Sequence, residues 1–361
     1  MTVSSYFSQS YGEAREKFRE TAAAAGAGLA AHDHPVAGPA GEALHCDTAW
    51  FGPRDAAKVL VTVSATHGVE GFCGSGVQVG CIKEGIAAKL PDGVAHMAIH
   101  AINPYGFAWL RRVTEDNVDL NRNFVDFSAP LPRNPGYEEL AQAICPETWD
   151  DASIAESADV MEAYAEREGG RALQSAISGG QYSHPDGIFF GGRAPTWSHR
   201  TLKRIFAEDL AGAEHIAVID YHTGLGPRGY GERICVHAAG SAALERAGAW
   251  YDDDITSPAA GTSSSVVISG FNVMGMEAAA PQATVTAIAL EYGTIPTRLV
   301  RLALRADNWL HCHGDPASDQ GKAIKQQIRE AFYQDADDWK RMIWERAVDS
   351  HARALAGLTA L

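Results

Sequence analysis

The sequence has no long apolar run, no closely paired cysteines and no signal for secretion. No stretch reaches the roughly 18 apolar residues that a membrane-spanning helix needs. The N-terminus has neither a charged start nor an apolar segment typical of a signal peptide. Six scattered cysteines without a Cys-x-x-Cys pair indicate reduced, mostly buried thiols. We therefore expect a cytoplasmic protein with no membrane contact.

Positive charge is scarce as well. The chain carries 30 basic and 45 acidic residues, for a formal net charge of -15. Proteins that bind nucleic acid usually show a basic stripe or a run of Lys and Arg, and this chain has neither. Nucleic acid is therefore excluded as an expected partner. The composition leaves the oligomeric state open, with a homo-oligomer among the options.

Apolar segments of strand length alternate with segments of helical spacing along the chain. Its 361 residues, 46% of them apolar, can bury a large core. Strands are expected at 43–52, 58–64, 95–102, 215–220, 233–238, 265–268 and 284–291. Helices are expected at 6–31, 75–88, 155–177, 198–211, 297–313 and 321–355. This alternation predicts an α/β fold of three layers, α/β/α, around a mixed, mostly parallel central sheet.

We expect the whole chain, residues 1–361, to form a single domain. An N-terminal helix over 6–31 begins it, and helices within 297–355 close it. Residues 128–160 are richer in proline and acidic groups, which indicates an excursion between core elements.

Potential metal ligands follow two of the expected strands. His67 and Glu70 lie on the turn after 58–64, and His222 lies just beyond 215–220. In α/β folds the carboxyl ends of the strands are the usual place for a ligand. Two imidazoles and one carboxylate suit Zn²⁺ and leave a position open for water. A single histidine here would more often be a hydrogen-bonded loop residue, so the prediction of one zinc ion depends on all three.

Further polar residues are expected near this point. Asn121 and Arg122 belong to a polar segment after strand 95–102, and the planar guanidinium of Arg122 could hold a substrate carboxylate. Alone, this segment could equally be a solvated loop. Glu291 ends an apolar strand, where a carboxylate is costly unless it is paired or functional. His184, in a loop rich in Gly, Pro and aromatic residues, is a candidate substrate contact.

Together these motifs resemble the zinc carboxypeptidase superfamily. The resemblance rests on His67-x-x-Glu70, Asn103-Pro104-x-Gly106, the segment from Asp119 to Phe124, His222 and Glu291, in that order. The contexts Asp-x-His-Thr-Gly and Leu-Glu-Tyr-Gly are more similar to the branch that contains succinylglutamate desuccinylase and aspartoacylase. The resemblance covers roughly residues 58–295.

The resemblance implies the inner structure of the metal site. His67, Glu70 and His222 would bind the zinc ion. Asp119 matches the carboxylate that orients the first zinc histidine, which fixes the tautomer of His67.

The resemblance also implies the residues that act on the substrate. Glu291 matches the general base that later becomes the acid, and Arg112 matches the arginine that polarises the scissile carbonyl. Arg111 is its neighbour and an additional candidate for substrate binding. Asn121 and Arg122 match the pair that binds the terminal carboxylate of the substrate.

We therefore expect a zinc-dependent, carboxypeptidase-like hydrolase of amide bonds, acting on a peptide or small molecule with a free carboxylate. An N-acyl amino acid deacylase of the aspartoacylase or desuccinylase kind stays open. The alternative from another class is a binding protein that keeps the pocket without catalysis, which would have no use for Glu291. A thiol hydrolase using Cys73 lacks an evident His or Asn partner. Gly74 and Gly76 do not fit a dinucleotide fingerprint and are better explained by close helix packing.

Overall fold

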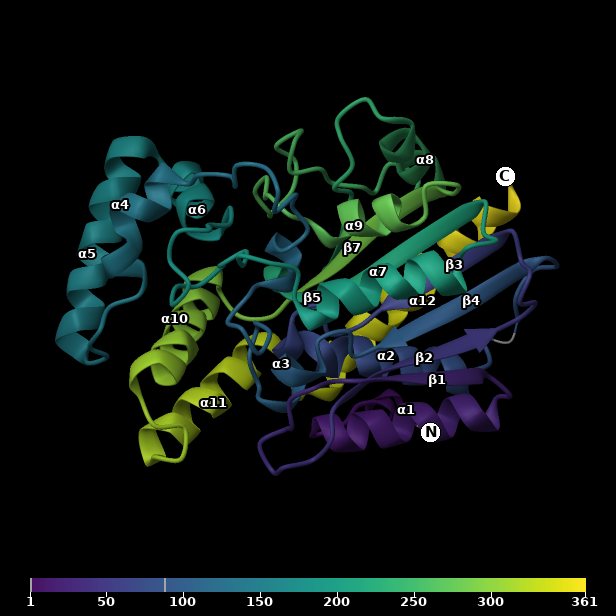
Figure 1. Ribbon diagram of the computed structural model, residues 1–361, viewed down its shortest axis with the longest axis horizontal. Helices are drawn as coiled ribbons and strands as arrows, with labels where there is room; N and C mark the ends of the chain where they lie inside the picture. Colours follow the sequence, from purple (N-terminus) through teal and green to yellow (C-terminus); the bar gives the residue numbers. More distant parts are fainter. Residues whose placement is uncertain (1, 88) are drawn as a thin grey trace.

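A seven-stranded mixed sheet forms the centre of the computed structural model, which describes residues 2–87 and 89–361 (Figure 1). The strand order is β1-β2-β4-β3-β5-β7-β6. Strands β4, β3, β5 and β7 run parallel. On one side β2 pairs antiparallel with β4 and β1 pairs antiparallel with β2, and on the other side β6 pairs antiparallel with β7. The strands are β1 (Gly28–Asp33), β2 (His45–Phe51), β3 (Lys58–Val63), β4 (Val94–His100), β5 (His215–Arg228), β6 (Gly231–Ile234) and β7 (Thr284–Gly293).

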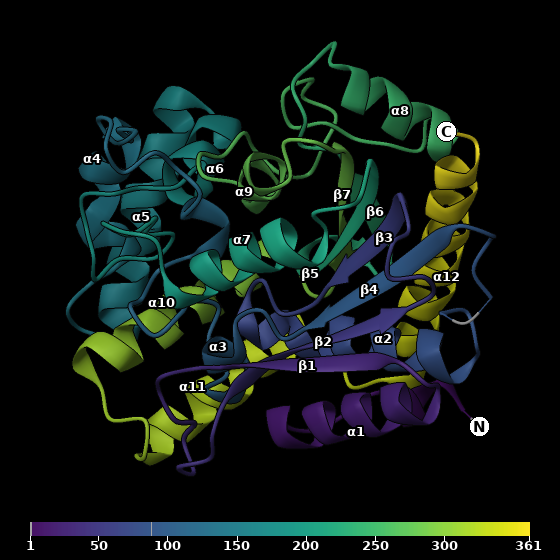
Figure 2. The same ribbon diagram turned by 45° about the vertical axis from the view of Figure 1, so that its right-hand side comes forward.

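Helices cover both faces of this sheet (Figure 2). Helices α1, α2 and α12 pack on one face, and α7 and α9 pack on the other. The prediction of a three-layer α/β/α fold with a mixed, mostly parallel central sheet is confirmed. The helices are α1 (Tyr11–Ala24), α2 (Gly71–Lys83), α3 (Pro104–Ala108), α4 (Pro135–Ile144), α5 (Asp151–Glu168), α6 (Gly170–Ser178), α7 (Trp197–Asp209), α8 (Ala242–Trp250), α9 (Asn272–Ala279), α10 (Thr297–His313), α11 (Asp319–Phe332) and α12 (Asp337–Thr359). Short 3₁₀ turns are η1 (Val3–Tyr6), η2 (Gly68–Glu70) and η3 (Leu120–Arg122).

A third apolar cluster lies beyond the carboxyl ends of the parallel strands. It joins helices α4, α6, α10 and α11 to the loops that leave the sheet, through buried residues that include Tyr137, Ile177, Phe189, Val300 and Phe332. The region predicted as an excursion, 128–160, contains α4 and the first part of α5, and these helices belong to this cluster. The excursion therefore builds one wall beside the strand ends.

The N-terminal helix is shorter than the predicted 6–31. Helix α1 ends at Ala24, Gly26 takes a left-handed φ of 77°, and β1 follows at 28–33. This edge strand was missed because four of its six residues are exposed, so it lacks the alternating apolar pattern of a half-buried strand.

Two other predicted helices are each divided in two. The segment 155–177 belongs to α5 and α6, which are separated at Gly169, where φ is 96°. The segment 321–355 belongs to α11 and α12, which are separated by the extended Tyr333, whose ring is buried. The predicted strand at 265–268 is irregular, so the apolar residues there belong to a loop.

The thiols agree with a reduced protein. All six cysteines are free, and four of them are buried. Within residues 2–87 and 89–361, none of the helices combines the length and the apolar content that crossing a bilayer requires.

Three buried histidines make the fold sensitive to acid. Burial lowers the pKa of His96 to about 3 and those of His100 and His351 to about 4. Each folded-state pKa lies below the value near 6.5 of an unfolded chain, so the unfolded state binds more protons below pH 6.5. Their contribution to stability is therefore complete above about pH 6.5 and is lost as the pH falls toward about 4.

We predict that His351→Gln flattens the dependence of the unfolding free energy on pH. Removing this one titration should decrease the loss of unfolding free energy between pH 6.5 and 4.5 by roughly 2 to 3 kcal/mol. Urea unfolding at several pH values measures it, with the exposed His313→Gln as the control. Equal slopes for His351→Gln and the unmodified protein would contradict the assignment.

Candidate metal centre and substrate pocket

The register of the parallel strands brings three potential metal ligands to one edge of the sheet. Val63 at the end of β3 pairs with Asp220 of β5, and His222 of β5 pairs directly with Glu291 of β7. His67 follows β3 after Ala65, which takes a left-handed φ of 59°. That φ is rare for a residue with a side chain, and such conformations persist where the surroundings enforce them.

A close contact between two loops holds the His67 turn in place. The backbone N–H of Gly68 donates to the carbonyl of Arg112 at 3.1 Å, and that of Val69 donates to the carbonyl of Arg111 at 2.8 Å. A Cβ at Gly68 would lie only 1.9 Å from the carbonyl carbon of Gly106. Glycine is therefore required here, because any side chain would push the two loops apart.

The glycines of α2 have the packing role that the sequence indicated. A Cβ at Gly74 would lie 2.7 Å from the Cβ of Ser64 and 3.1 Å from that of Tyr221. Helix α2 thus approaches the sheet closely just behind the turn that carries His67 and Glu70.

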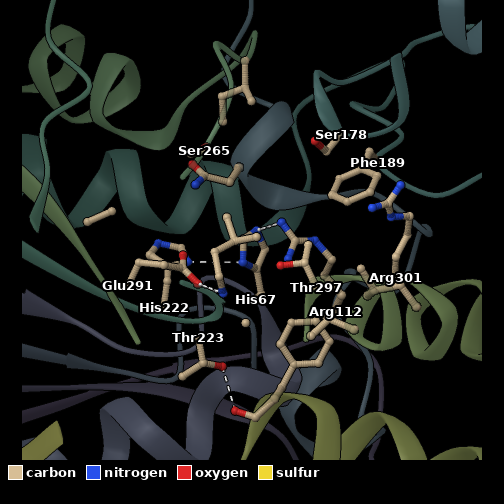
Figure 3. Close-up of a pocket in the computed structure, with 18 of the residues that line it drawn as sticks. His67, Arg112, Ser178, Phe189, His222, Thr223, Ser265, Glu291, Thr297 and Arg301 are labelled. Carbon is tan, nitrogen blue, oxygen red and sulfur yellow. Dashed lines mark hydrogen bonds between the residues drawn. The ribbon is translucent and has the colours of Figure 1, made fainter. Parts of the chain in front are cut away.

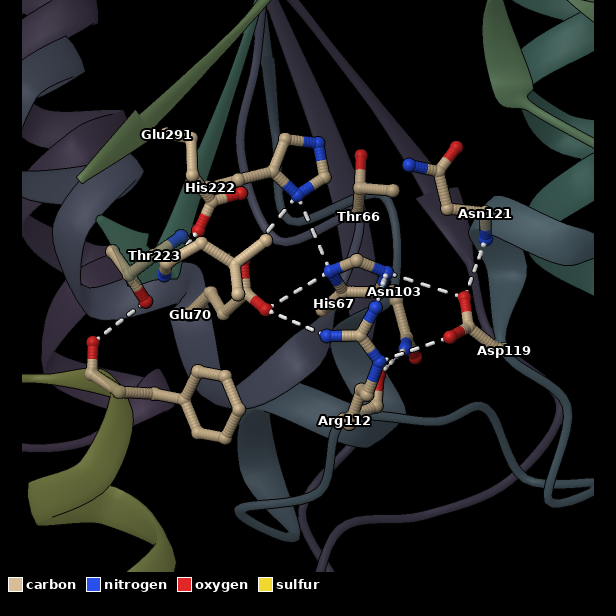
Figure 4. Close-up of polar contacts among 12 residues, drawn as sticks. Thr66, His67, Glu70, Asn103, Arg112, Asp119, Asn121, His222, Thr223 and Glu291 are labelled. Atoms are coloured by element: carbon tan, nitrogen blue, oxygen red, sulfur yellow. Dashed lines mark hydrogen bonds and ion pairs between the residues drawn. The ribbon is translucent and has the colours of Figure 1, made fainter. Parts of the chain in front are cut away.

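His67, Glu70 and His222 form a buried group whose potential ligand atoms all lie within 4.8 Å of one another. His67 Nδ1 lies 2.9 Å from Glu70 Oε1, and His222 Nδ1 lies 3.3 Å from Glu70 Oε2 (Figure 4). The two Nδ1 atoms are 3.2 Å apart. All three predicted ligands are therefore adjacent, with the same ring nitrogen of each histidine toward the centre.

A carboxylate stands behind each of these imidazoles. His67 Nε2 lies 3.2 Å from Asp119 Oδ1, and His222 Nε2 lies 2.8 Å from Asp220 Oδ2. A carboxylate on Nε2 favours the tautomer that leaves the Nδ1 lone pair free for a metal. The position of Asp119 agrees with the predicted orienting role.

Asp220 had no predicted role. Thr66 Oγ1 donates to its Oδ1 at 2.8 Å, and Asn272 Nδ2 donates to its Oδ2 at 2.7 Å, so its position is fixed from two sides. The spacing Asp-x-His on an expected strand was the available signal. Side chains two residues apart on a strand share a face, so Asp220 had to lie beside His222.

The two buried glutamates of the site have opposite pKa shifts. Burial alone would raise the pKa of Glu70, but His67 and His222 outweigh it and hold that pKa below its usual range. Burial raises the pKa of Glu291 to about 8, and the negative charge of Glu70 adds to the rise. The N–H of Leu225 donates to Glu291 Oε1 at 3.0 Å and partly opposes it. Glu291 can thus exchange a proton near neutral pH.

Arg112 lies between Glu70, one of the potential metal ligands, and Asp119. Its Nη1 lies 3.1 Å from Glu70 Oε1, and its Nε lies 2.9 Å from Asp119 Oδ2. Burial alone would lower the pKa of Arg112, but the negative charges of Asp119 and Glu70 outweigh burial and raise that pKa, so the guanidinium stays charged. Figure 4 shows it next to His67.

A pocket opens over this group. His67, Arg112, His222 and Glu291 line it, as Figure 3 shows. Asn121 and Arg122 also belong to the lining. The rest of the lining is mainly apolar and comes from distant segments, including Ile177, Phe189, Ile234, Ile268, Phe271, Val300, Leu304 and Phe332. An apolar cavity with a few convergent polar groups is typical of a small-molecule site.

Asn121 and Arg122 each keep hydrogen-bonding capacity for a ligand. Asn121 Oδ1 accepts from the N–H of Asn272 at 3.0 Å, which leaves its Nδ2 without a partner among the described residues. Arg122 Nη1 donates to the Asn121 carbonyl at 2.9 Å and Nη2 to the Ser178 carbonyl at 2.6 Å, while its buried Nε has no partner among residues 2–87 and 89–361. Burial lowers the Arg122 pKa to about 10.

Two predicted substrate contacts do not line the pocket. Arg111 Nε lies 3.3 Å from Asp307 Oδ2, and its Nη2 donates to Asn117 at 2.8 Å. Neighbouring side chains on this irregular segment diverge, so Arg111 ties the loop to α10 while Arg112 enters the site. His184 lies 2.9 Å from the Ser183 hydroxyl, with its ring 5.6 Å from that of Tyr137. Both residues have structural contacts, and neither supports the expected substrate role.

No sequence pattern points to Arg301, a pocket residue on α10. Within the helix predicted at 297–313, nothing in the sequence distinguishes it from Arg298 or Arg305. Arginines are common on helices, and only the fold shows which one lines a cavity.

A family profile matches residues 7–346 of the chain, and this match decides its family. The chain belongs to the DUF2817 family. Members of that family are described as proteins of unknown function. No curated protein matches the sequence. The place of this DUF2817 protein among known folds therefore comes from solved structures.

Bovine thrombin-activatable fibrinolysis inhibitor, solved in complex with tick carboxypeptidase inhibitor, matches this DUF2817 protein with a TM-score of 0.50 at 10% identity; the match covers 98% of this chain and 97% of the other. Carboxypeptidase A from Helicoverpa armigera matches with a TM-score of 0.48 at 15% identity, over 96% and 73%. A putative succinylglutamate desuccinylase/aspartoacylase from Shewanella frigidimarina matches with a TM-score of 0.38 at 15% identity, over 80% and 72%. The expected carboxypeptidase-like fold is confirmed.

We predict that Asp220→Asn weakens metal binding by about 10- to 100-fold, because the imidazole of His222 loses its orienting carboxylate. Titration with zinc against a competing chelator measures the affinity. Asp209→Asn, an exposed residue at the end of α7, is the control. An unchanged affinity in Asp220→Asn would show that the contact with His222 serves only the fold.

Proposed function

We propose that this protein is a zinc-dependent hydrolase of amide bonds whose substrate carries a free carboxylate. The observation behind this proposal is the buried group of His67, Glu70 and His222 with Glu291 paired directly opposite His222 in the sheet. No salt bridge to Glu291 exists within residues 2–87 and 89–361, and burying such a carboxylate is costly. A protein that only bound a ligand would have no reason to keep it there.

The donor set fits a zinc ion. Two imidazole nitrogens and a carboxylate are a common combination for catalytic zinc, and all three groups are buried. Asp119 and Asp220 would keep each Nδ1 available by accepting a hydrogen bond from Nε2. Zn²⁺ held there would lower the pKa of a water molecule and polarise the substrate carbonyl.

The chain itself would handle the proton and part of the developing charge. Glu291 would accept the proton of the attacking water and later deliver it to the leaving nitrogen. Its pKa, raised to about 8 by burial and by Glu70, suits a group that must both take and give a proton near neutral pH. Arg112, which lines the pocket, would donate to the carbonyl oxygen as negative charge develops on it.

Asn121 and Arg122 would orient the substrate. The Nδ2 of Asn121 and the guanidinium of Arg122, whose Nη1 and Nη2 each donate one N–H to a backbone carbonyl, lie at the pocket wall on neighbouring residues of η3. A substrate carboxylate could accept from both. Holding it would place the amide in a fixed position relative to Glu291. A peptide C-terminus is the substrate we favour, and an N-acyl amino acid is the alternative that uses the same contacts.

We predict that Glu291→Gln retains about one equivalent of zinc but loses turnover by roughly 10²- to 10⁴-fold, because it removes the proton acceptor. Elemental analysis and hydrolysis assays measure the two quantities, with the exposed Glu214→Gln as control. Chelation should abolish turnover of the unmodified protein, and added zinc should restore it. Failure to take up zinc at all would remove the proposal, and full activity in Glu291→Gln would remove the role of this residue.

We predict that Arg122→Ala raises KM for carboxylate-bearing substrates much more than for the corresponding C-terminal amides, by roughly tenfold or more for one lost charged hydrogen bond. The measurement is a hydrolysis screen of C-terminal peptides and N-acyl amino acids, each as free acid and as amide. Arg298→Ala is the matched control, because this arginine is exposed and does not line the pocket. An equal rise in KM for the free acids and the amides would show that Arg122 has only a structural role.

A further inference from the structure

Arg301 differs from the other arginines around the pocket because it has no hydrogen-bond or ion-pair partner in the part of the chain that the structure describes. Arg112 pairs with Glu70 and Asp119, and Arg122 donates to two carbonyl oxygens. Arg305, one turn further along α10, donates to the carbonyls of Ile144 and Ala143 at 2.8 Å each. For Arg301, the described residues provide neither a hydrogen bond nor an ion pair, and burial alone lowers its pKa.

The unpaired guanidinium belongs to a helix face that lines the pocket. Thr297, Val300, Arg301 and Leu304 all contribute to the lining, with the spacing of one side of a helix. Figure 3 shows Arg301 on the same side of the pocket as Phe189. Arg301 is half-buried next to the buried apolar residues Val300 and Leu304, and a charge in such a place interacts more strongly with an anion than it would in bulk water.

The charged side chains around the pocket also leave Arg301 without a counter-charge. Among the side chains that line the pocket there are three guanidinium groups, Arg112, Arg122 and Arg301, but only one carboxylate, Glu291. Glu70 and Asp119 balance Arg112, and Asp119 lies 3.8 Å from Arg122. Arg301 is therefore the positive charge that the protein leaves unbalanced, and a planar guanidinium with all its donors free fits a carboxylate well.

We propose that Arg301 binds a second carboxylate of the substrate, so that this pocket selects amides that carry two carboxylates. The inference rests on the proposed function insofar as Asn121 and Arg122 hold the first carboxylate. Arg301 comes from α10 and the pair from η3, so the two anionic groups are bound by different elements. The second carboxylate belongs either to the side chain of the leaving amino acid or to the far end of the acyl group, and matched substrates distinguish these two sources.

The first test measures binding without turnover. Calorimetry in the presence of a chelator compares N-acetylglutamate with N-acetylglutamine, and N-succinylalanine with N-butyrylalanine. Each pair differs by one carboxylate, on the amine side or on the acyl side. We expect the dicarboxylate of one pair to bind at least tenfold more tightly. This preference should disappear in Arg301→Ala and persist in Arg298→Ala, an exposed arginine of the same helix outside the pocket.

The second test uses the zinc-loaded protein. The ratio of kcat/KM within the preferred pair should fall toward one in Arg301→Ala, mainly through KM. Arg301→Gln, which removes the charge but keeps a polar stem, replaces Arg301→Ala if that variant does not fold.

The results separate this inference from the proposed function. The absence of any dicarboxylate preference, or a preference that survives removal of Arg301, would overturn the role of Arg301 even if the protein hydrolyses amides. A preference in binding that depends on Arg301, without hydrolysis of either pair or of any C-terminal peptide in the screen by the zinc-loaded protein, would support the role of Arg301 and overturn the proposed function.

Discussion

The parallel register of β3, β5 and β7 is the constraint on which the site depends. It places His222 directly opposite Glu291 and brings the turn after β3 to the same edge. A shift of one residue in β5 would turn His222 and Asp220 to the other face of the sheet, because side chains alternate along a strand. The buried cores on both faces prevent that shift, since it would expose apolar residues such as Ile219 and Val218 to the opposite layer.

The charges of the site balance only incompletely without a cation. Asp119 and Asp220 each have donors around them, so their burial is compensated. Glu70 and Glu291 repel each other, which is one cause of the raised pKa of Glu291. Two neighbouring buried carboxylates are stabilised either by a proton on one of them or by a nearby cation. A divalent cation between His67, Glu70 and His222 would remove this conflict, so the electrostatics and the ligand geometry favour the same occupant.

The sequence predicted best those parts of the molecule that short-range patterns determine. Apolar strands such as β3 and β7 are continuous runs, and the residues that follow them had to lie at one sheet edge. The exposed edge strand β1 has no such run, so the sequence pattern predicts a helix there. Arg111 and Arg112 are identical in type and adjacent, and only the path of the loop decides that Arg112 faces the pocket while Arg111 faces Asp307. Asp220 could have been inferred from strand periodicity, whereas Arg301 could not, because its position depends on how α10 packs.

The origin of Arg301 has a consequence for specificity. The potential metal ligands and Glu291 belong to strand ends and the turns after them, which the sheet holds rigidly. Arg301 lies instead on a helix of the third apolar cluster, as does part of the apolar wall of the pocket. This cluster is itself anchored by a buried ion network in which Asp307 of α10 contacts both Arg111 and Lys325. Because Arg111 adjoins Arg112 in the chain, the loop that carries the polarising guanidinium and the helix that carries Arg301 are tied to each other. The position of the unbalanced charge relative to the metal-type ligands is therefore set by the fold, as selection between substrates of different charge requires.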